Sequence, residues 1–118
     1  MSLYISHHLL LCANSQKSLC CEQNEGNKSW EKLKNVLRIL NLEDPTRPEG
    51  IVLRSKVDCL RVCKSGPILL IWPEGIWYES VSSYRIERII KSHIIKGAPI
   101  KEWIFKETPL RTMASSSF

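Results

Sequence analysis

The segment Pro67-Ile-Leu-Leu-Ile-Trp72 is followed directly by Pro73-Glu-Gly75 and then by Ile76-Trp-Tyr-Glu79. The outer two segments are rich in apolar, β-branched and aromatic residues, and the proline and glycine between them are typical of a turn. Pro67 is tolerated because it stands at the first position of a strand, where its missing N–H interrupts no ladder. The stretch therefore predicts an antiparallel β-hairpin.

A strand, a helix and a second strand are predicted before this hairpin. A short apolar run, His8–Cys12, leads into a polar turn-forming stretch, and Ile51–Ser55 is short and β-rich. Between them, from about Asn27 to about Leu42, apolar residues recur at spacings of three and four, which predicts a helix capped by Asn27 or Ser29. Its apolar face is formed by Trp30, Leu33, Val36, Leu37 and Leu40.

A second amphipathic helix is predicted after the hairpin, beginning at Ser82 or Ser83 and stopped by the segment 96–99, which contains glycine and proline. Its apolar face comprises Ile86, Ile89, Ile90 and His93 or Ile94. The residues 100–105 are expected to form a terminal strand or an extended segment.

The order strand, helix, strand, hairpin, helix is that of the thioredoxin-like fold in the α/β class. The first βαβ unit would be parallel and the hairpin would add antiparallel strands. We therefore expect a central mixed sheet of four to five strands with helices on both faces. Residues 1–106 are predicted to form this domain, and residues 107–118, which include several serines and show no periodicity, are predicted to be a disordered tail.

Composition limits the function classes. A chain of 118 residues with 43% hydrophobic and 25% charged residues is typical of one globular domain. No apolar run reaches the roughly 20 residues of a membrane span, and the start has no basic region or cleavage site of a secretory signal, so we expect a soluble cytoplasmic protein. The net charge of +5 is scattered without a basic block. This argues against nucleic acid and favours an acidic protein partner.

Five cysteines fall into two groups: Cys12, Cys20 and Cys21, and then Cys59 and Cys63. Structural disulfides are not expected in a reducing cytoplasm, so metal or redox chemistry is the leading interpretation, although buried cysteines also occur simply as small apolar residues. Each group follows a predicted strand, and the carboxyl ends of parallel strands lie at one sheet edge. Four thiolates would suit a [2Fe–2S] cluster or tetrahedral zinc. The Cys-x3-Cys spacing favours iron, because zinc ribbons commonly use a two-residue spacing.

The sequence resembles the thioredoxin-like [2Fe–2S] ferredoxins from about His8 to Phe105. The family pattern is a Cys-Leu-x-x-Cys loop, a Gly-Pro entry to an apolar strand, and Pro-Glu-Gly-x-Trp-Tyr. The matching segments here are Cys59-Leu-Arg-Val-Cys63, Gly66-Pro67 and Pro73-Glu-Gly-Ile-Trp-Tyr78. The adjacent pair Cys20-Cys21, with the next glycine only at Gly26, resembles cyanobacterial-type members of this family.

The resemblance implies a non-enzymatic electron carrier that exchanges one electron between redox protein partners. It assigns Cys12, Cys59 and Cys63 as ligands of a [2Fe–2S] cluster, and leaves open whether Cys20 or Cys21 is the fourth. Lys56, Arg61 and Lys64 lie in or beside the second cysteine segment. If these cations lie close to the anionic cluster they stabilise its reduced form and make its potential less negative than that of an acidic ferredoxin, but they are equally expected merely to solvate a loop.

Several alternatives follow from the same residues. A non-catalytic iron–sulfur subunit of a larger oxidoreductase would share the fold and the cluster, and a zinc-bound or cluster-less interaction module is a further alternative. A thiol-redox protein is disfavoured, because no Cys-x-x-Cys follows the first strand. The resemblance also implies a homodimer, for which the hairpin residues Trp72, Trp77 and Tyr78 are the expected contact surface.

Other conspicuous residues are expected to be structural. Trp30, Trp72 and Trp77 occupy apolar positions of the first helix and the hairpin, which favours core or subunit contacts. His7 and His8 are not expected to be Rieske-type ligands, because the thiols already suffice. Glu74 is expected to be a solvated turn residue with no acid–base role.

Overall fold

The computed structural model of this chain describes residues 4–12, 23–57 and 66–110. The described elements follow the predicted order. They are the strand β1 (Ile5–Cys12), the helix α1 (Gln23–Ile39), the strands β2 (Ile51–Val57), β3 (Ile68–Trp72) and β4 (Ile76–Tyr78), the helix α2 (Ser83–Ile89) and the strand β5 (Ile104–Glu107). A π-helical turn, η1 (Ile90–Ile95), continues α2, and a 3-10 turn, η2 (Lys101–Trp103), precedes β5.

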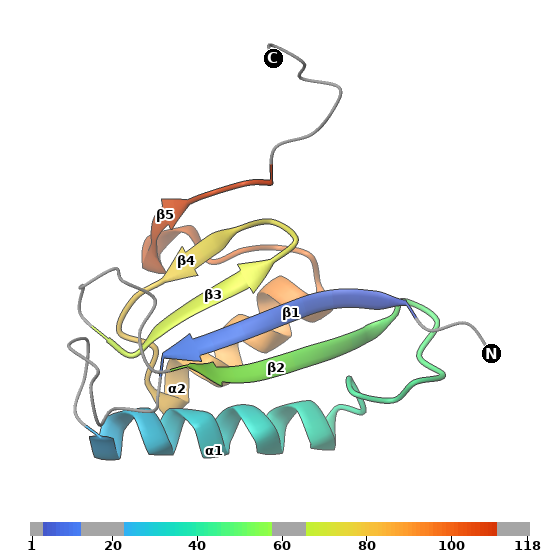
Figure 1. Ribbon diagram of the computed structural model, residues 1–118, viewed down its shortest axis with the longest axis horizontal. Coiled ribbons are helices and arrows are strands. Elements are labelled where there is room, and N and C mark those ends of the chain that lie inside the picture. The colour runs from blue at the N-terminus through green and yellow to red at the C-terminus, as the bar shows by residue number, and fades with distance from the viewer. Residues whose placement is uncertain (1–3, 13–22, 58–65, 111–118) are drawn as a thin grey trace, which may run out of the picture.

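The sheet is mixed, as predicted, with the strand order β2-β1-β3-β4-β5. β1 and β2 are parallel neighbours, and β3, β4 and β5 add antiparallel pairs (Figure 1). β1 is thus a central strand that pairs with β2 on one side and β3 on the other. Because β1 and β2 run in the same direction, their last residues, Cys12 and Val57, lie side by side in register.

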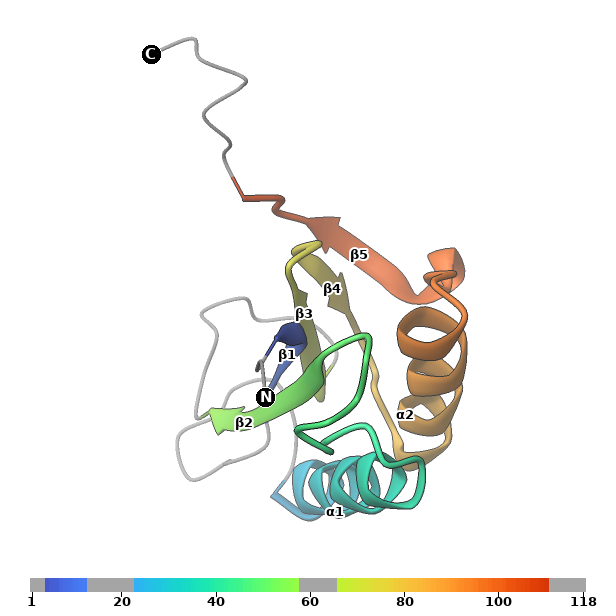
Figure 2. The same cartoon turned by 90° about the vertical axis from the view of Figure 1, so that its right-hand side faces the viewer.

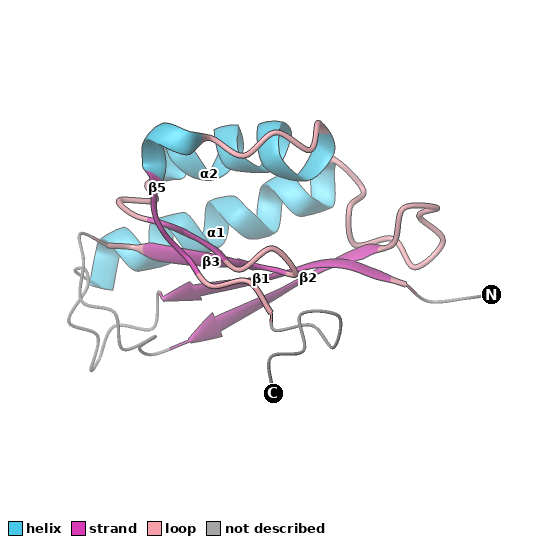
Figure 3. Ribbon diagram, turned by 90° about the horizontal axis from the view of Figure 1, so that it is seen from above, coloured by secondary structure: helices cyan, strands magenta, loops and turns pink. Residues whose placement is uncertain are grey.

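Both helices lie on one face of the sheet, which corrects the prediction of helices on both faces (Figure 3). One core cluster joins apolar residues of α1, such as Leu37, and of α2, such as Ile89, to Leu9, Leu69 and other strand residues. The pattern of β3 did not reveal this arrangement, because Ile68, Leu69, Leu70 and Ile71 are all buried and alternation gives no preferred face. In Figure 2, α1 lies below the strands and α2 lies to the right of them, next to α1.

The opposite face of the sheet carries a second, smaller cluster. Its buried members are Cys12, Ile68, Leu70 and Trp77, and its partly buried members are Leu10, Val57, Trp72 and Phe105. Residues of β1 therefore alternate between the two clusters: Leu9 and Leu11 face the helices, whereas Leu10 and Cys12 face away from them. This alternation places the Cys12 side chain on the face without helices.

Helix α1 begins four residues before the predicted start at Asn27, so neither Asn27 nor Ser29 is its cap. Ser29 is instead fully buried, and its hydroxyl donates to the Val81 carbonyl over 2.6 Å. The predicted cap of α2 is confirmed, because the Ser82 Oγ accepts a hydrogen bond from the Arg85 backbone N–H. The predicted apolar face of this helix is confirmed: Ile86, Ile89 and Ile90 are fully buried, and His93 and Ile94 are only 1% and 5% exposed.

The hairpin turn depends on Gly75. Its φ of +71° is in the left-handed region, and a Cβ at this position would lie 2.2 Å from the backbone oxygen of Thr108. The Thr108 N–H donates to the Gly75 carbonyl over 2.7 Å, and Trp77 Nε1 donates to the Thr108 hydroxyl over 2.7 Å. Ordered pairing thus reaches Glu107 and Thr108, beyond the predicted domain limit at 106. Residues 111–118 of the predicted tail lie outside the described residues.

Candidate metal centre

Cys12 is the last residue of β1 and has 1% of its surface exposed. It is in register with Val57 at the end of β2 and with Ile68 at the start of β3. The strands on both sides hold its backbone, and Ile68, Leu70 and Trp77 pack in the same cluster as its side chain. A thiol in this position is fixed by the sheet and shielded from solvent.

The cysteine-bearing segments of the chain connect to the sheet beside Cys12. Segment 13–22, with Cys20 and Cys21, starts directly after Cys12, and segment 58–65, with Cys59 and Cys63, starts directly after the neighbouring Val57. Both segments, and hence these four predicted ligands, lie outside the described residues. The structure therefore locates one of the five candidate ligands. The soft thiol of Cys12, at the edge where the parallel strands end, fits one corner of a thiolate-bound metal or cluster.

Lys56, predicted to lie near the cluster, is in register with Leu11, one of the residues that face the helices. Its ammonium group lies 5.7 Å from the centre of the Trp30 ring, and the Arg54 guanidinium lies 5.3 Å from the same ring. The two cations thus interact with an aromatic face on α1, on the side of the sheet opposite Cys12. The other two predicted cations, Arg61 and Lys64, lie outside the described residues.

A second group of polar side chains gathers at the other end of β1. The Glu74 Oε2 atom lies 3.3 Å from the Nε2 atoms of both His7 and His93. On the far side of the His93 ring, Nδ1 is 2.8 Å from the Tyr78 hydroxyl, which accepts a hydrogen bond from the Ile100 backbone N–H over 3.1 Å. The sequence predicted that Glu74 is a solvated turn residue. In the structure it is instead the centre of a polar cluster.

Burial and charge shift the pKa values in this cluster. Burial opposes ionisation of Glu74, yet its own backbone N–H and the imidazoles of His7 and His93 together hold the pKa of its carboxyl below the usual value. Burial lowers the pKa of His93, although Glu74 acts in the opposite direction. Burial also raises the pKa of Tyr78 to about 12, so that it remains a phenol. Glu74 is accordingly a carboxylate at neutral pH.

Sequence reasoning missed this cluster because its members are far apart in the chain and each had another role. His93 was expected on the apolar face of the second helix, where it is indeed buried. His7 precedes the apolar run of β1, and neighbouring His8 points elsewhere, to Ser55 Oγ at 2.8 Å. A histidine on an otherwise apolar helix face was the one signal, since a buried imidazole needs a polar partner.

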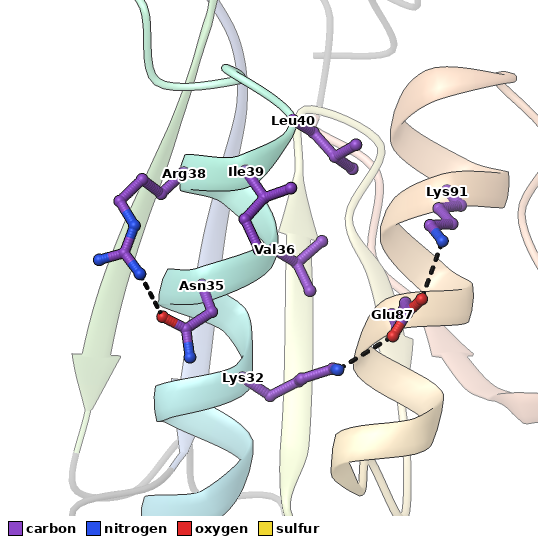
Figure 4. Close-up of a pocket in the computed structure, with 8 residues that line it drawn as sticks. All are labelled: Lys32, Asn35, Val36, Arg38, Ile39, Leu40, Glu87 and Lys91. Atoms are coloured by element: carbon purple, nitrogen blue, oxygen red, sulfur yellow. Dashed lines mark hydrogen bonds and ion pairs between the residues drawn. The ribbon is translucent and has the colours of Figure 1, made fainter.

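A surface groove of about 450 Å³ lies between α1 and α2 (Figure 4). Lys32 of α1 binds the Glu87 carboxylate across it at 3.0 Å, and Lys91, one turn after Glu87 on the same side, binds that carboxylate at 2.8 Å. Apolar atoms of Val36, Ile39 and Leu40 line its other side. The groove contains ion pairs but none of the thiol or imidazole groups that would hold a metal.

The three tryptophans that the sequence analysis interpreted as structural, Trp30, Trp72 and Trp77, are packed in the two core clusters, and Trp77 is the most buried of them.

Helices of membrane-spanning length and apolarity do not occur in the described part of the chain. No family model matches the sequence. The chain is 29% identical over 100 residues to "Ferredoxin, 2Fe-2S" of Clostridium pasteurianum, a match that covers 80% of this chain and 91% of that protein. It is 27% identical over 101 residues to "Putative 2Fe-2S ferredoxin" of Priestia megaterium, covering 86% and 71%.

Solved structures show the same fold. A thioredoxin-like [2Fe–2S] ferredoxin from Aquifex aeolicus superimposes with a TM-score of 0.70 at 18% identity, covering 88% of this chain and 94% of that one. The wild-type protein in a second crystal structure gives a TM-score of 0.66 at 17% identity, covering 85% and 96%. The predicted thioredoxin-like fold is confirmed. The chain is therefore similar in sequence to proteins named 2Fe–2S ferredoxins, and similar in fold to a thioredoxin-like [2Fe–2S] ferredoxin.

Proposed function

We propose that this chain is an electron carrier whose [2Fe–2S] cluster is bound by the thiolates of Cys12, Cys59, Cys63 and one of Cys20 and Cys21. The observation that carries the proposal is the position of Cys12, buried at the sheet edge beside the point where the second cysteine-bearing segment begins. The relatives named 2Fe–2S ferredoxins support the choice of iron over zinc.

A bound [2Fe–2S] cluster accepts and releases one electron. The contribution of the protein is to hold its ligands and set the surroundings of the cluster. Pairing with β2 and β3 fixes the Cys12 backbone, so that its sulfur needs little rearrangement to bind. Ile68 and Leu70, both nearly inaccessible, exclude water from one side of that sulfur.

The remaining parts of the proposal concern partners and place. The net charge of +5 favours docking to acidic redox proteins, and such docking would weaken as salt is added. We place the carrier in the cytoplasm, where five cysteines remain reduced and available to iron. The adjacent Cys20-Cys21 pair supports the cyanobacterial type within the family. A homodimer also remains part of this proposal, but Trp77 and Tyr78 of the predicted contact surface are only 8% and 0% exposed within the chain, so these two side chains cannot form that surface.

The test is a series of single Cys→Ser variants purified without oxygen, with iron, sulfide and zinc analysis, visible absorption, and EPR after dithionite. We expect the wild type to contain two irons and two sulfides per chain, as a [2Fe–2S] cluster requires, and to give a rhombic signal on reduction. Cys12→Ser, Cys59→Ser and Cys63→Ser should each lose the cluster or shift its absorption and EPR.

Cys20→Ser and Cys21→Ser form a matched pair, because only one of these adjacent thiols is needed as the fourth ligand. We expect one variant to keep the wild-type spectrum and the other to lose it. Zinc in place of iron in the wild type, or an unchanged cluster in Cys12→Ser, would contradict the proposed function.

A further inference from the structure

The His7, Glu74 and His93 side chains come from three different elements: β1, the β3–β4 turn and η1. The ligand atoms of the three residues all lie within 4.8 Å of one another. We propose that they form a second metal site, separate from the cysteines, which binds a divalent ion of the zinc type through two imidazoles and one carboxylate.

The distances from Glu74 to the two histidines fit a tetrahedral ion. Zinc bonds of about 2.0–2.1 Å to nitrogen and oxygen place neighbouring ligand atoms about 3.3–3.4 Å apart in a tetrahedron. Glu74 Oε2 lies 3.3 Å from His7 Nε2 and 3.3 Å from His93 Nε2. Two edges of the tetrahedron are therefore already formed. Two imidazoles and a carboxylate suit zinc and its transition-metal neighbours, whereas calcium and magnesium prefer oxygen ligands alone.

His93 Nε2 is a second, independent observation. The His93 side chain is 1% exposed, and its Nε2 atom makes no hydrogen bond of acceptable geometry among the described residues, although Glu74 is close. A buried polar atom without a well-aligned partner costs free energy, and a metal ion would provide that partner. The atom faces the same space as His7 Nε2 and the Glu74 carboxylate.

The opposite ring nitrogens have the outer partners that metal-bound histidines use. His93 Nδ1 meets the Tyr78 hydroxyl at 2.8 Å, and His7 Nδ1 meets Ser6 Oγ at 3.1 Å. With a metal on Nε2, each Nδ1 carries the proton and donates it to these oxygens, which fixes both the tautomer and the ring orientation. Tyr78 is thus a positioning residue for the site.

Ions can reach the site from solvent, since the side chains of His7 and Glu74 are 16% and 38% exposed. A water molecule would complete the coordination from the open side. The site is distinct from Cys12 because His7 and Cys12 are five positions apart in β1, or roughly 16 Å along the strand. A bound ion would join β1, the hairpin turn and η1, which makes the site structural in effect.

The test uses the full chain as purified without oxygen, treated with a mild chelator and then titrated with zinc. Zinc affinity by competition with a chromophoric chelator, zinc and iron content, and zinc X-ray absorption are measured in the same samples. We expect one zinc bound by nitrogen and oxygen only, and at least about tenfold weaker binding in His7→Gln and Glu74→Gln, since even outer partners contribute 10–100-fold.

His8→Gln is the matched control, because His8 is the adjacent histidine of β1 but contacts Ser55 instead. It should bind zinc as the wild type does, and Tyr78→Phe should bind it more weakly than the wild type. Zinc should also raise the melting temperature of the wild type but not of Glu74→Gln. The proposal is overturned if no zinc binds, if the bound zinc has sulfur ligands in all samples, or if His7→Gln and Glu74→Gln bind as tightly as the wild type. Unchanged iron content across these variants separates this result from the proposed function.

Discussion

At its carboxyl end β1 presents Cys12 to the edge where the cysteine-bearing segments begin, whereas near its amino end it presents His7 to Glu74 and His93. The first end carries the Cys12 thiol, and the two segments that contain the other four cysteines begin directly after Cys12 and Val57. The second uses imidazole and carboxylate groups that are up to 86 positions apart, from His7 to His93. β1 therefore carries chemically different groups near its two ends, and the extended strand holds these groups apart.

The largest expected effect comes from breaking the histidine end through Gly75. In Gly75→Ala the new Cβ would lie 2.2 Å from the Thr108 backbone oxygen, in addition to the strain of a φ of +71°. We expect the free energy of unfolding to fall by roughly 2–4 kcal/mol, measured from urea midpoints. Zinc binding should weaken because Glu74 is the adjacent residue, while iron bound per folded chain should stay unchanged.

Gly97→Ala is the control, since Gly97 has the same φ of +71° but no atom within 4 Å of the added Cβ. Left-handed strain alone should cost it about 1 kcal/mol. An equal loss of unfolding free energy in the two variants would show that the segment after β5 can move away from the hairpin turn without destabilising the fold.

The next effect concerns the cysteine end, through Ser29. Its buried hydroxyl donates to the Val81 carbonyl, and the Val81 N–H donates to the Pro67 carbonyl, so the bond links α1 to the start of β3. Ser29→Ala leaves that carbonyl without this donor and should cost about 1–2 kcal/mol of unfolding free energy. We expect Ser29→Ala to lose iron to a chelator faster than the wild type and to bind zinc with unchanged affinity. This result would show that the substitution affects the cysteine end of β1 and not the histidine end.

Ser83→Ala is the comparison for this variant, because the Ser83 hydroxyl makes only an exposed 3.4 Å contact with the Lys28 carbonyl. Its urea midpoint should match that of the wild type closely. A loss as large as that of Ser29→Ala would refute the special role of the buried bond.

The smallest effect is expected at Glu87, which touches neither end. Hydrogen bonds from Lys91 and then Lys32 lower the pKa of its carboxyl to about 2. Because the folded-state pKa is depressed, the ion pairs stabilise the fold above the ordinary pKa of 4.5, and this contribution disappears as the pH falls toward 2. The unfolding free energies of wild type and Glu87→Gln should therefore differ slightly at neutral pH and converge in acid, with salt reducing the difference.

The sequence predicted local structure correctly where a short run of residues was compatible with only one structure. The Pro-Glu-Gly turn and the apolar helix faces are confirmed, and the second helix is capped by Ser82, one of the two serines predicted, because turn chemistry and amphipathic periodicity act over a few residues. The face chosen by α2 could not be predicted, because β3 is apolar on both sides. The start of α1 was misplaced because the polar residues 23–26 carry no apolar period.

The same reasoning explains the candidate sites. Cys12 could be chosen as a candidate ligand from the sequence because cysteines are few and follow predicted strands, and the structure confirms that it ends a strand. His7, Glu74 and His93 could not be grouped, because nothing local distinguishes a histidine with a distant carboxylate from one that only fills a core. Their meeting depends on the antiparallel pairing of β1 with β3, which brings the turn after β3 to the start of β1.

That pairing also has a consequence during synthesis. β1 is an inner strand of the sheet and is synthesised before both of its neighbours, because its paired residues in β2 and β3 lie at least 45 positions later in the chain. Until they emerge, the Leu9 and Leu11 side chains have no sheet to enter, and contacts this far apart in sequence form slowly. During synthesis the apolar side chains of β1 therefore stay exposed until β2 and β3 are available. Cys12 reaches its final surroundings only once most of the domain has been translated.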